Sequence, residues 1–364
     1  MKIGVIKEIK DNENRVALTP DGARELIAAG HSVAVEHGAG TGSGIADSDY
    51  AKAGSTLVTA ADAWDSELVI KVKEPLESEY PQLRQQILFT YLHLAGVDPG
   101  LTEALLRAGT TAIAYESITD SAGRLPLLLP MSAVAGSMAP IMGCYHLARY
   151  TGGRGVLLAN ILGNRIGKVL VIGDGVVGQN AARVAAAMGA RVLLFGVFRE
   201  RKQELEGIAP GIEFVLSTAD SIAAELTDTD LVIGAVLVKG ARAPHVISET
   251  MVKTMPAGSV IVDVSIDQGG CVATSRPTTH SDPVFVTHGV VHYCVTNMPG
   301  AYPITSTLAL TKATLPYIKR VAAGELDGVF SDAELATGVN TYQGHITCEA
   351  VAEALGRRDA YRPL

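Results

Sequence analysis

Short apolar runs alternate with amphipathic stretches along this chain, a rhythm typical of parallel strands joined by helical crossovers. The first runs predict strands at Lys2–Ile6, Ser32–Glu36, Leu68–Val72, Gln86–Thr90 and Thr111–Ala114. Helices are predicted between them at Thr19–Ala29, Ala60–Asp65 and Gly100–Ala108. A second set predicts strands at Lys168–Ile172, Arg191–Phe195, Glu213–Val215, Leu231–Gly234, Ser259–Asp263 and Phe285–Thr287. The pattern therefore predicts an α/β protein with two doubly wound, parallel-sheet, Rossmann-like domains and a cleft between them.

Two apolar helical patterns flank the second set of strands. One begins near Pro130 and the other runs from Thr305 to about Ala323, with polar helices expected from there to the end. The stretch Leu125–Ala148 has no charged residue and is long enough to span a bilayer, but its prolines favour a buried interdomain helix. We therefore expect no membrane segment. The domain boundaries follow: residues 130–304 form one domain, and residues 1–129 plus 305–364 form the other.

A glycine-rich turn sits where the second set of strands begins. The apolar strand Lys168–Ile172 leads into Gly173-Asp-Gly175-Val-Val-Gly178, and a small-residue helix follows to Met188. The first glycine permits the tight turn, the second lets a pyrophosphate approach the backbone, and the third lets helix and strand pack closely. The helix N-terminus offers free N–H groups to the phosphates. We expect residues 130–304 to bind a dinucleotide.

Composition narrows the class of protein further. The chain has 364 residues, of which 48% are hydrophobic and 19% charged, enough apolar residues for two buried cores. A net charge of −8 without a basic run argues against nucleic acid as a partner. The four cysteines show no metal-binding spacing, so we expect reduced thiols, no metal site and a cytoplasmic location. The N-terminus reads as a strand rather than a signal peptide.

A series of short motifs recurs in a fixed order. They are Lys7-Glu8, residues 14–20 (NRVALTP), 71–75 (KVKEP), 89–95 (FTYLHLA), 130–132 (PMS), 152–158 (GGRGVLL), 233–238 (IGAVLV), 263–270 (DVSIDQGG) and 297–299 (NMP). Together they resemble the alanine dehydrogenase family over essentially the whole chain. The resemblance implies a hexameric, NAD-linked enzyme that interconverts L-alanine and water with pyruvate and ammonia.

Four polar residues fit the chemistry of a small 2-oxo acid. Arg15 offers a bidentate fork for the substrate carboxylate. His93 follows an apolar strand, and histidine is the side chain most often used to donate and accept protons in catalysis. Lys73 also follows a strand and is expected to polarise the carbonyl oxygen, while Asp267 would orient water or ammonia and partner His93.

On residues alone, each of these four also fits a structural role: a surface arginine, a buried histidine, a solvated lysine and a turn-capping aspartate. The resemblance places all four at matching positions. It further implies Ser132 near the cofactor phosphates, and Val238, Asn297 and Met298 near the nicotinamide.

The chain departs from the family pattern around the expected cofactor site. Gly196 stands after the strand where an aspartate should accept hydrogen bonds from the adenosine ribose. Without that carboxylate, a 2′-phosphate is no longer repelled, and Arg199 or Arg201 could bind it, which would favour NADP. Alternatively, Glu200 or water replaces the lost contact to the ribose, and the protein still binds NAD. The choice between NAD and NADP stays open. Further departures are Ser137 in place of an arginine, residues 160–164 (NILGN) in place of GGVPG, and Lys239 in place of a proline.

Other functions stay open beside alanine dehydrogenation. One is a dehydrogenase for another small amino acid, and another is an opine-type reductase that joins a 2-oxo acid to a larger amine. A third is a non-catalytic regulatory protein that binds cofactor without turnover. The related soluble domain of proton-translocating transhydrogenase is disfavoured because Lys73 and His93 fit a substrate site.

Overall fold

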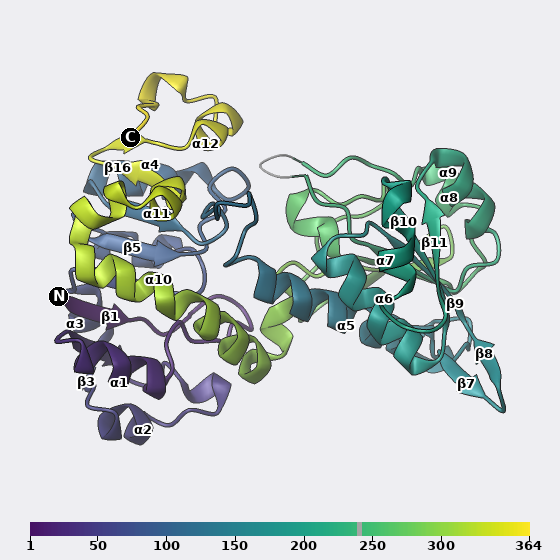
Figure 1. Cartoon of the computed structure of the whole chain (residues 1–364), viewed down its shortest axis with the longest axis horizontal. Helices are drawn as coiled ribbons and strands as arrows, with labels where there is room; N and C mark the ends of the chain where they lie inside the picture. The colour runs from purple at the N-terminus through teal and green to yellow at the C-terminus, as the bar shows by residue number, and fades with distance from the viewer. Residues whose placement is uncertain (239–241) are drawn as a thin grey trace. The chain divides into compact units, whose positions relative to one another are not determined.

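The chain forms two compact units. The computed structural model describes residues 1–238 and 242–364 (Figure 1). Unit 1 comprises Met1–Met131 and Gly300–Leu364, and unit 2 comprises Ser132–Pro299. Unit 1 is therefore built from both ends of the chain, with unit 2 inserted in the middle.

Unit 1 is built on a mostly parallel sheet. Its strands are β1 (Lys2–Val5), β2 (Ser32–Glu36), β3 (Thr56–Val58), β4 (Leu68–Ile70), β5 (Ile87–Thr90), β6 (Thr111–Ala114), β16 (Val339–Tyr342) and β17 (His345–Ile346). Their order in the sheet is β17-β16-β6-β5-β4-β1-β2-β3. The chain moves outward from β1 to β3, then returns to β4 on the other side of β1, so the topological switch point lies between β1 and β4.

Unit 1 also contains several short helices and one long helix, α10, of 29 residues. They are α1 (Pro20–Ala28), α2 (Asp47–Lys52), α3 (Ala60–Trp64), α4 (Pro99–Ala108), α10 (Pro303–Ser331), α11 (Ala333–Gly338) and α12 (Glu349–Ala354). Helix α1 begins after Thr19, whose side chain accepts a hydrogen bond from the backbone N–H of Gly22. Helix α4 begins after Asp98, whose side chain accepts one from the backbone N–H of Gly100. Both have proline in the first turn, which suits a helix start. Helix α10 belongs to unit 1, and its Thr307 hydroxyl accepts from the Val16 backbone at 3.1 Å.

The end of the chain differs from the sequence prediction. Polar helices were expected to continue to the C-terminus, but β16 and β17 follow α11 and form an antiparallel hairpin on β6. The two-residue turn Gln343-Gly344 has positive φ angles at both positions, as such hairpins need. Because β16 pairs with a strand more than 200 residues earlier, its local pattern alone did not reveal it.

Unit 2 repeats the doubly wound topology. Its main strands are β9 (Lys168–Ile172), β10 (Arg191–Gly196), β11 (Ile212–Leu216), β12 (Leu231–Gly234), β13 (Val260–Asp263), β14 (Val284–Thr287) and β15 (Val290–Tyr293). They lie in the order β11-β10-β9-β12-β13-β15-β14, and only the β14–β15 pair is antiparallel. The switch point therefore lies between β9 and β12. The expected fold class, Rossmann-like parallel sheets, is confirmed.

The helices of unit 2 flank this sheet, and a small hairpin stands apart from it. The helices are α5 (Leu129–Leu147, which begins in unit 1), α6 (Val176–Met188), α7 (Lys202–Glu206), α8 (Ala219–Leu226) and α9 (Glu249–Val252). The hairpin is β7 (Ala159–Ile161) with β8 (Asn164–Ile166). In the described parts of the chain no helix meets the length and apolarity needed to cross a membrane. Helix α5 is not buried all round, because Ile141 and Tyr145 are 45% and 51% exposed.

Candidate active site

Three predicted substrate residues of unit 1 lie on loops that leave neighbouring strands. Arg15 follows β1, Lys73 follows β4 and His93 follows β5. Strand β4 pairs in parallel with both β1 and β5, so the three loops leave one edge of the sheet. The switch point between β1 and β4 is where ligands of doubly wound sheets bind. The structure thus brings Arg15, Lys73 and His93 to one region of unit 1.

Arg15 is a buried arginine oriented by a neighbouring acid. Its Nε donates to Glu13 Oε1 at 2.7 Å, and its Nη2 pairs with Glu13 Oε2. Its Nη1 donates to the Sδ of Met131. Burial lowers the pKa of Arg15, but the hydrogen bonds and charge of Glu13 outweigh it and leave the pKa raised. The guanidinium is therefore a fixed, buried cation and not a surface arginine, whereas its predicted contact with the substrate carboxylate stays a prediction.

The Tyr91 ring contacts both of the other two side chains. The His93 ring stacks on the Tyr91 ring with centroids 5.7 Å apart, and Lys73 Nζ lies 6.0 Å from the same ring. The Tyr91 hydroxyl donates to the Leu127 carbonyl at 2.6 Å, which fixes the ring. Burial raises the pKa of Tyr91, so the hydroxyl stays protonated and neutral. Tyr91 is therefore a platform that sets the positions of Lys73 and His93.

His93 sits in an unusual backbone conformation held by Glu116. Its φ is +49°, a left-handed value that non-glycine residues rarely adopt. Glu116, just beyond β6, accepts from the His93 backbone at 2.6 Å and from that of Leu92. The same carboxylate lies 3.8 Å from His93 Nδ1. Glu116 therefore holds the loop and faces the imidazole, with Nδ1 as the ring nitrogen nearest to it.

A buried charge network supports the Lys73 loop. Lys71 is fully buried and pairs with Glu8 at 3.2 Å and Glu79 at 2.9 Å. Glu8 also accepts from the backbone of Val72 and Lys73. Burial raises the pKa of Glu8, although Lys71 opposes that shift. The network therefore fixes the backbone of Val72 and Lys73, directly after Lys71.

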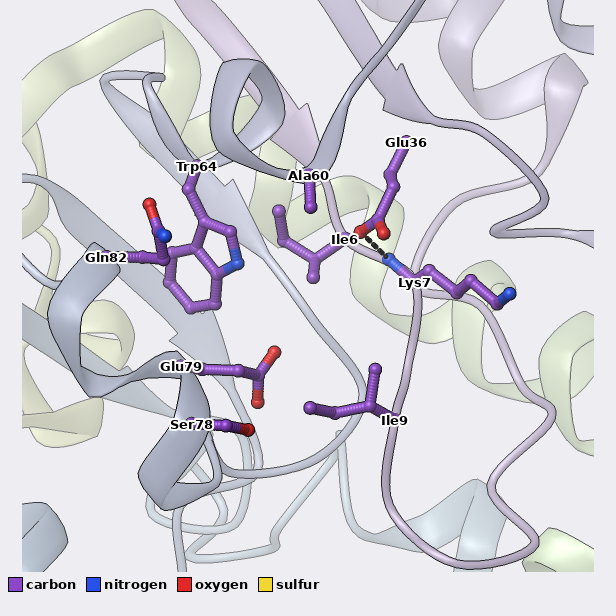
Figure 2. A pocket seen from close by; sticks show the side chains of 9 residues that line it. All are labelled: Ile6, Lys7, Ile9, Glu36, Ala60, Trp64, Ser78, Glu79 and Gln82. Atoms are coloured by element: carbon purple, nitrogen blue, oxygen red, sulfur yellow. Dashed lines mark hydrogen bonds between the residues drawn. The ribbon is translucent and has the colours of Figure 1, made fainter.

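A pocket of about 150 Å³ lies beside this network in unit 1 (Figure 2). The Glu79 carboxylate points into it between Trp64 and Ile9, while the Lys7 side chain points away. Its lining residues are Ile6, Lys7, Ile9, Glu36, Ala60, Trp64, Ser78, Glu79 and Gln82. None of the predicted site residues lines it, so we assign the substrate residues to the strand ends rather than to this pocket.

In unit 2 the glycine turn has the geometry that a dinucleotide requires. A Cβ on Gly178 would lie 1.8 Å from the Gly173 carbonyl oxygen, and one on Gly173 would lie 2.4 Å from that of Ala235. Gly173 also has a φ of +114°. Around a Cβ on Gly175, no described atom lies within 4 Å. Two glycines are thus needed for packing, and the third leaves open space at the N-terminus of α6 where a pyrophosphate fits.

The remaining predicted cofactor residues are also placed in unit 2. Ser132 is half-buried in the first turn of α5, and Val238 is exposed after β12. Asn297 and Met298 are buried after β15, with Asn297 at a φ of +64°. Lys239 lies outside the described residues. Apart from Ser132, these positions follow carboxyl ends of strands, as the glycine turn does.

Asp267 lies in a one-turn helix after β13 (Val264–Gln268) and is exposed. The buried carboxylate of Asp263 fixes this segment, because it accepts from the backbone of Ser265, Cys271 and Val272. Burial raises the pKa of Asp263 against the effect of these hydrogen bonds. Asp267 and His93 belong to different units, so their predicted partnership stays a prediction.

Comparison with known proteins identifies the family. The model of the alanine dehydrogenase/PNT N-terminal domain matches residues 4–135, and that of the C-terminal domain matches residues 139–349. An alanine dehydrogenase from Halomonas elongata is 50% identical over 361 residues, 98% of this chain and 97% of the relative. The chain belongs to the alanine dehydrogenase/PNT family.

Solved structures of this family agree in fold. An L-alanine dehydrogenase superposes with a TM-score of 0.93 at 47% identity, covering 98% of this chain and 99% of that one. A transhydrogenase from Sinorhizobium meliloti superposes with a TM-score of 0.81 at 26% identity, covering 96% and 100%. This member of the alanine dehydrogenase/PNT family is thus more similar to the dehydrogenase than to the transhydrogenase.

Several polar residues of this family member escaped the sequence analysis. Glu13 was visible only as a neighbour of Arg15, and Tyr91 as part of an apolar run. Glu116 follows β6 just as His93 follows β5, so its position at a strand end was an available signal. The roles of these residues depend on long-range contacts, which the sequence does not display.

The departures from the family pattern have local structural consequences. The Ser137 hydroxyl donates to the Ala133 carbonyl at 2.8 Å, within α5. Residues 160–164 form the end of the β7–β8 hairpin, whose two-residue turn Leu162-Gly163 has positive φ at both positions. Gly196 is buried at the end of β10, and Arg199 is exposed at the next turn.

The glycine turn yields a first test. Gly178→Ala forces a methyl against the Gly173 carbonyl, so we expect it to lower the free energy of unfolding by about 3 kcal/mol or more. Gly175→Ala is the matched control, because its methyl meets open space at an ordinary φ of −76°. We expect it to leave thermal denaturation unchanged but to weaken NADH binding in a fluorescence titration. Equal destabilisation by both substitutions would contradict the assigned roles.

The Glu116 contact yields a second test. Glu116→Ala removes the acceptor that holds the His93 backbone, so we expect kcat to fall about a hundredfold with little change in KM for the cofactor. Glu116→Gln retains a carbonyl oxygen as acceptor and should recover part of this loss. Steady-state kinetics of the two variants checks the expectation. A Glu116→Ala enzyme with normal kcat would show that the contact does not position His93.

Proposed function

We propose that this chain is a nicotinamide-dependent L-alanine dehydrogenase. The reaction converts L-alanine, water and the oxidised cofactor into pyruvate, ammonium and the reduced cofactor, with release of one proton. The observation that carries the proposal is the convergence of Arg15, Lys73 and His93 at the switch point of unit 1, in a chain whose other unit has an intact dinucleotide turn. The name shared by its full-length relatives supports the same substrate.

In this proposal unit 1 binds the substrate. Arg15 is oriented by Glu13 and pairs with the substrate carboxylate through charge-assisted hydrogen bonds. Lys73 donates to the 2-oxo oxygen and withdraws electron density from the reacting carbon. His93 exchanges the proton that the substrate oxygen or nitrogen gains and loses, and Asp267 orients the attacking water or ammonia.

Unit 2 binds the cofactor in this proposal. The turn at Gly173, Gly175 and Gly178 receives the pyrophosphate, Ser132 lies near the phosphates, and Val238, Asn297 and Met298 hold the nicotinamide. When bound, the cofactor accepts or supplies the hydride at the substrate C2. We propose that residues 130–304 form the cofactor domain and that residues 1–129 with 305–364 form the substrate domain.

We also propose a homo-oligomer, a hexamer by family resemblance. Support comes from exposed apolar side chains along one stretch of chain from α5 to the β7–β8 hairpin: Ile141, Tyr145, Tyr150, Leu157, Ile161 and Leu162. Apolar residues exposed in such number on one segment are typical of interaction surfaces. The four free cysteines are compatible with a reducing compartment, and we propose the cytoplasm.

Turnover tests the function directly. We expect oxidation of NADH or NADPH with pyruvate and ammonium, and a loss of turnover of about a hundredfold or more in His93→Asn and in Asp267→Asn. Cofactor binding, followed by fluorescence, should persist in both variants. His345→Asn, at an exposed histidine of β17, is the control. Full activity in either site variant would remove that residue from the mechanism, and no alanine formation by the wild type would refute the function.

The oligomer proposal has its own test at Leu162, which is 96% exposed at the hairpin turn. Leu162→Asp suits the positive φ of this turn, so the hairpin should still form. We expect the substitution to shift the mass measured by light scattering toward smaller assemblies. Val286→Asp, at a 63% exposed residue of β14, is the matched control and should leave the mass unchanged. An unchanged mass in Leu162→Asp would place the interface elsewhere.

A further inference from the structure

The space beside Gly196, at the end of β10, is occupied by the side chain of Asp174 from the glycine turn. A Cβ built on Gly196 would lie 2.8 Å from Asp174 Oδ2 and 2.8 Å from Phe214 Cε2. The side-chain position where a ribose-binding aspartate was expected is therefore crowded, chiefly by Asp174 and the ring of Phe214. A carboxylate is nevertheless present there, because Asp174 reaches it from between Gly173 and Gly175.

Asp174 is held firmly in this place. Its Oδ2 accepts from Arg201 Nη1 at 2.6 Å, and the carbonyl oxygen of Asp174 accepts from Gln179 Nε2 at 3.0 Å. The Asp174 side chain is 14% exposed, so it reaches the surface of the turn without being free in solvent. The turn that receives the pyrophosphate thus carries a positioned carboxylate at the end of β10.

The Arg201 guanidinium pairs with two carboxylates. Besides Asp174, it pairs with Glu204 through Nε at 3.3 Å and Nη2 at 2.9 Å. One cation facing two anions does not present net positive charge to a phosphate. Of the two arginines considered for a 2′-phosphate, Arg201 is therefore already neutralised, and Arg199 is solvent-exposed.

These contacts indicate how the protein binds the adenosine ribose. This inference rests on the nicotinamide-dependent function proposed above. We propose that Asp174 accepts hydrogen bonds from the adenosine ribose hydroxyls in place of the missing aspartate at position 196, and that it makes the protein select NAD(H) over NADP(H). A carboxylate has two acceptor oxygens, so pairing of Oδ2 with Arg201 leaves the group able to serve the ribose. A 2′-phosphate at the same place meets the negative charge of Asp174.

Ligands without nicotinamide test this without any turnover. ADP-ribose and 2′-phospho-ADP-ribose are titrated calorimetrically into the full-length protein. We expect the wild type to bind ADP-ribose about tenfold tighter or more than 2′-phospho-ADP-ribose, since hydrogen bonds to a charged group have this magnitude. Asp174→Asn should lose most of this ratio, and Glu200→Gln should keep it. Tighter wild-type binding of the 2′-phosphate, or an unchanged ratio in Asp174→Asn, overturns the proposal.

A relocation of the carboxylate gives an independent test. Gly196→Asp alone crowds Asp174 and Phe214 and places two carboxylates together, so we expect weaker ADP-ribose binding, about tenfold or more. The double substitution Asp174→Gly with Gly196→Asp moves the carboxylate to the strand end and should restore the binding. Thermal denaturation of both variants reports on folding. Binding by the double variant no tighter than that of Gly196→Asp alone contradicts the proposal.

The two proposals fail in different ways. A protein that shows the Asp174-dependent preference but forms no alanine refutes the dehydrogenase function and retains the ribose contact. Alanine formation with a nucleotide preference that ignores Asp174 refutes the ribose contact alone.

Discussion

The parallel pairing of β4 with β1 on one side and β5 on the other is the constraint on which the substrate site depends. Because all three strands run in one direction, the loops that follow them leave the sheet at one edge. Arg15, Lys73 and His93 are far apart in sequence and meet only through this pairing. The same holds in unit 2, where the parallel pairing of β9 with β12 places Gly173 next to Ala235 at the ends of the two strands.

Fixed charges then give these loops their shape. Glu13 orients Arg15, and Glu116 holds the strained backbone of His93. Glu8 ties the Lys73 loop to the loop that follows β1. Each of these carboxylates binds backbone N–H groups or a buried cation. Buried charges are expensive unless paired in this way. Their arrangement is consistent with positioning of the substrate residues in unit 1 before substrate arrives.

Much of the fold could be predicted from local patterns, and less of the site. Strands such as Thr111–Ala114 and Leu231–Gly234 are continuous apolar runs with clear ends, and the structure has them at those residues. Strand β16 was missed because only its pairing with β6 makes it a strand. The contacts of Glu116 and Asp174 were missed for a related reason: their neighbours in space, His93 and Gly196, lie more than 20 residues away along the chain.

The proposed reaction delivers a hydride from the reduced cofactor to C2 of a 2-oxo acid while ammonia is incorporated. The most direct measurement uses NADH with deuterium at both C4 positions, together with pyruvate and ammonium, and examines the products by mass spectrometry. We expect alanine with one deuterium at C2. Deuterated lactate, or unlabelled alanine, would contradict it.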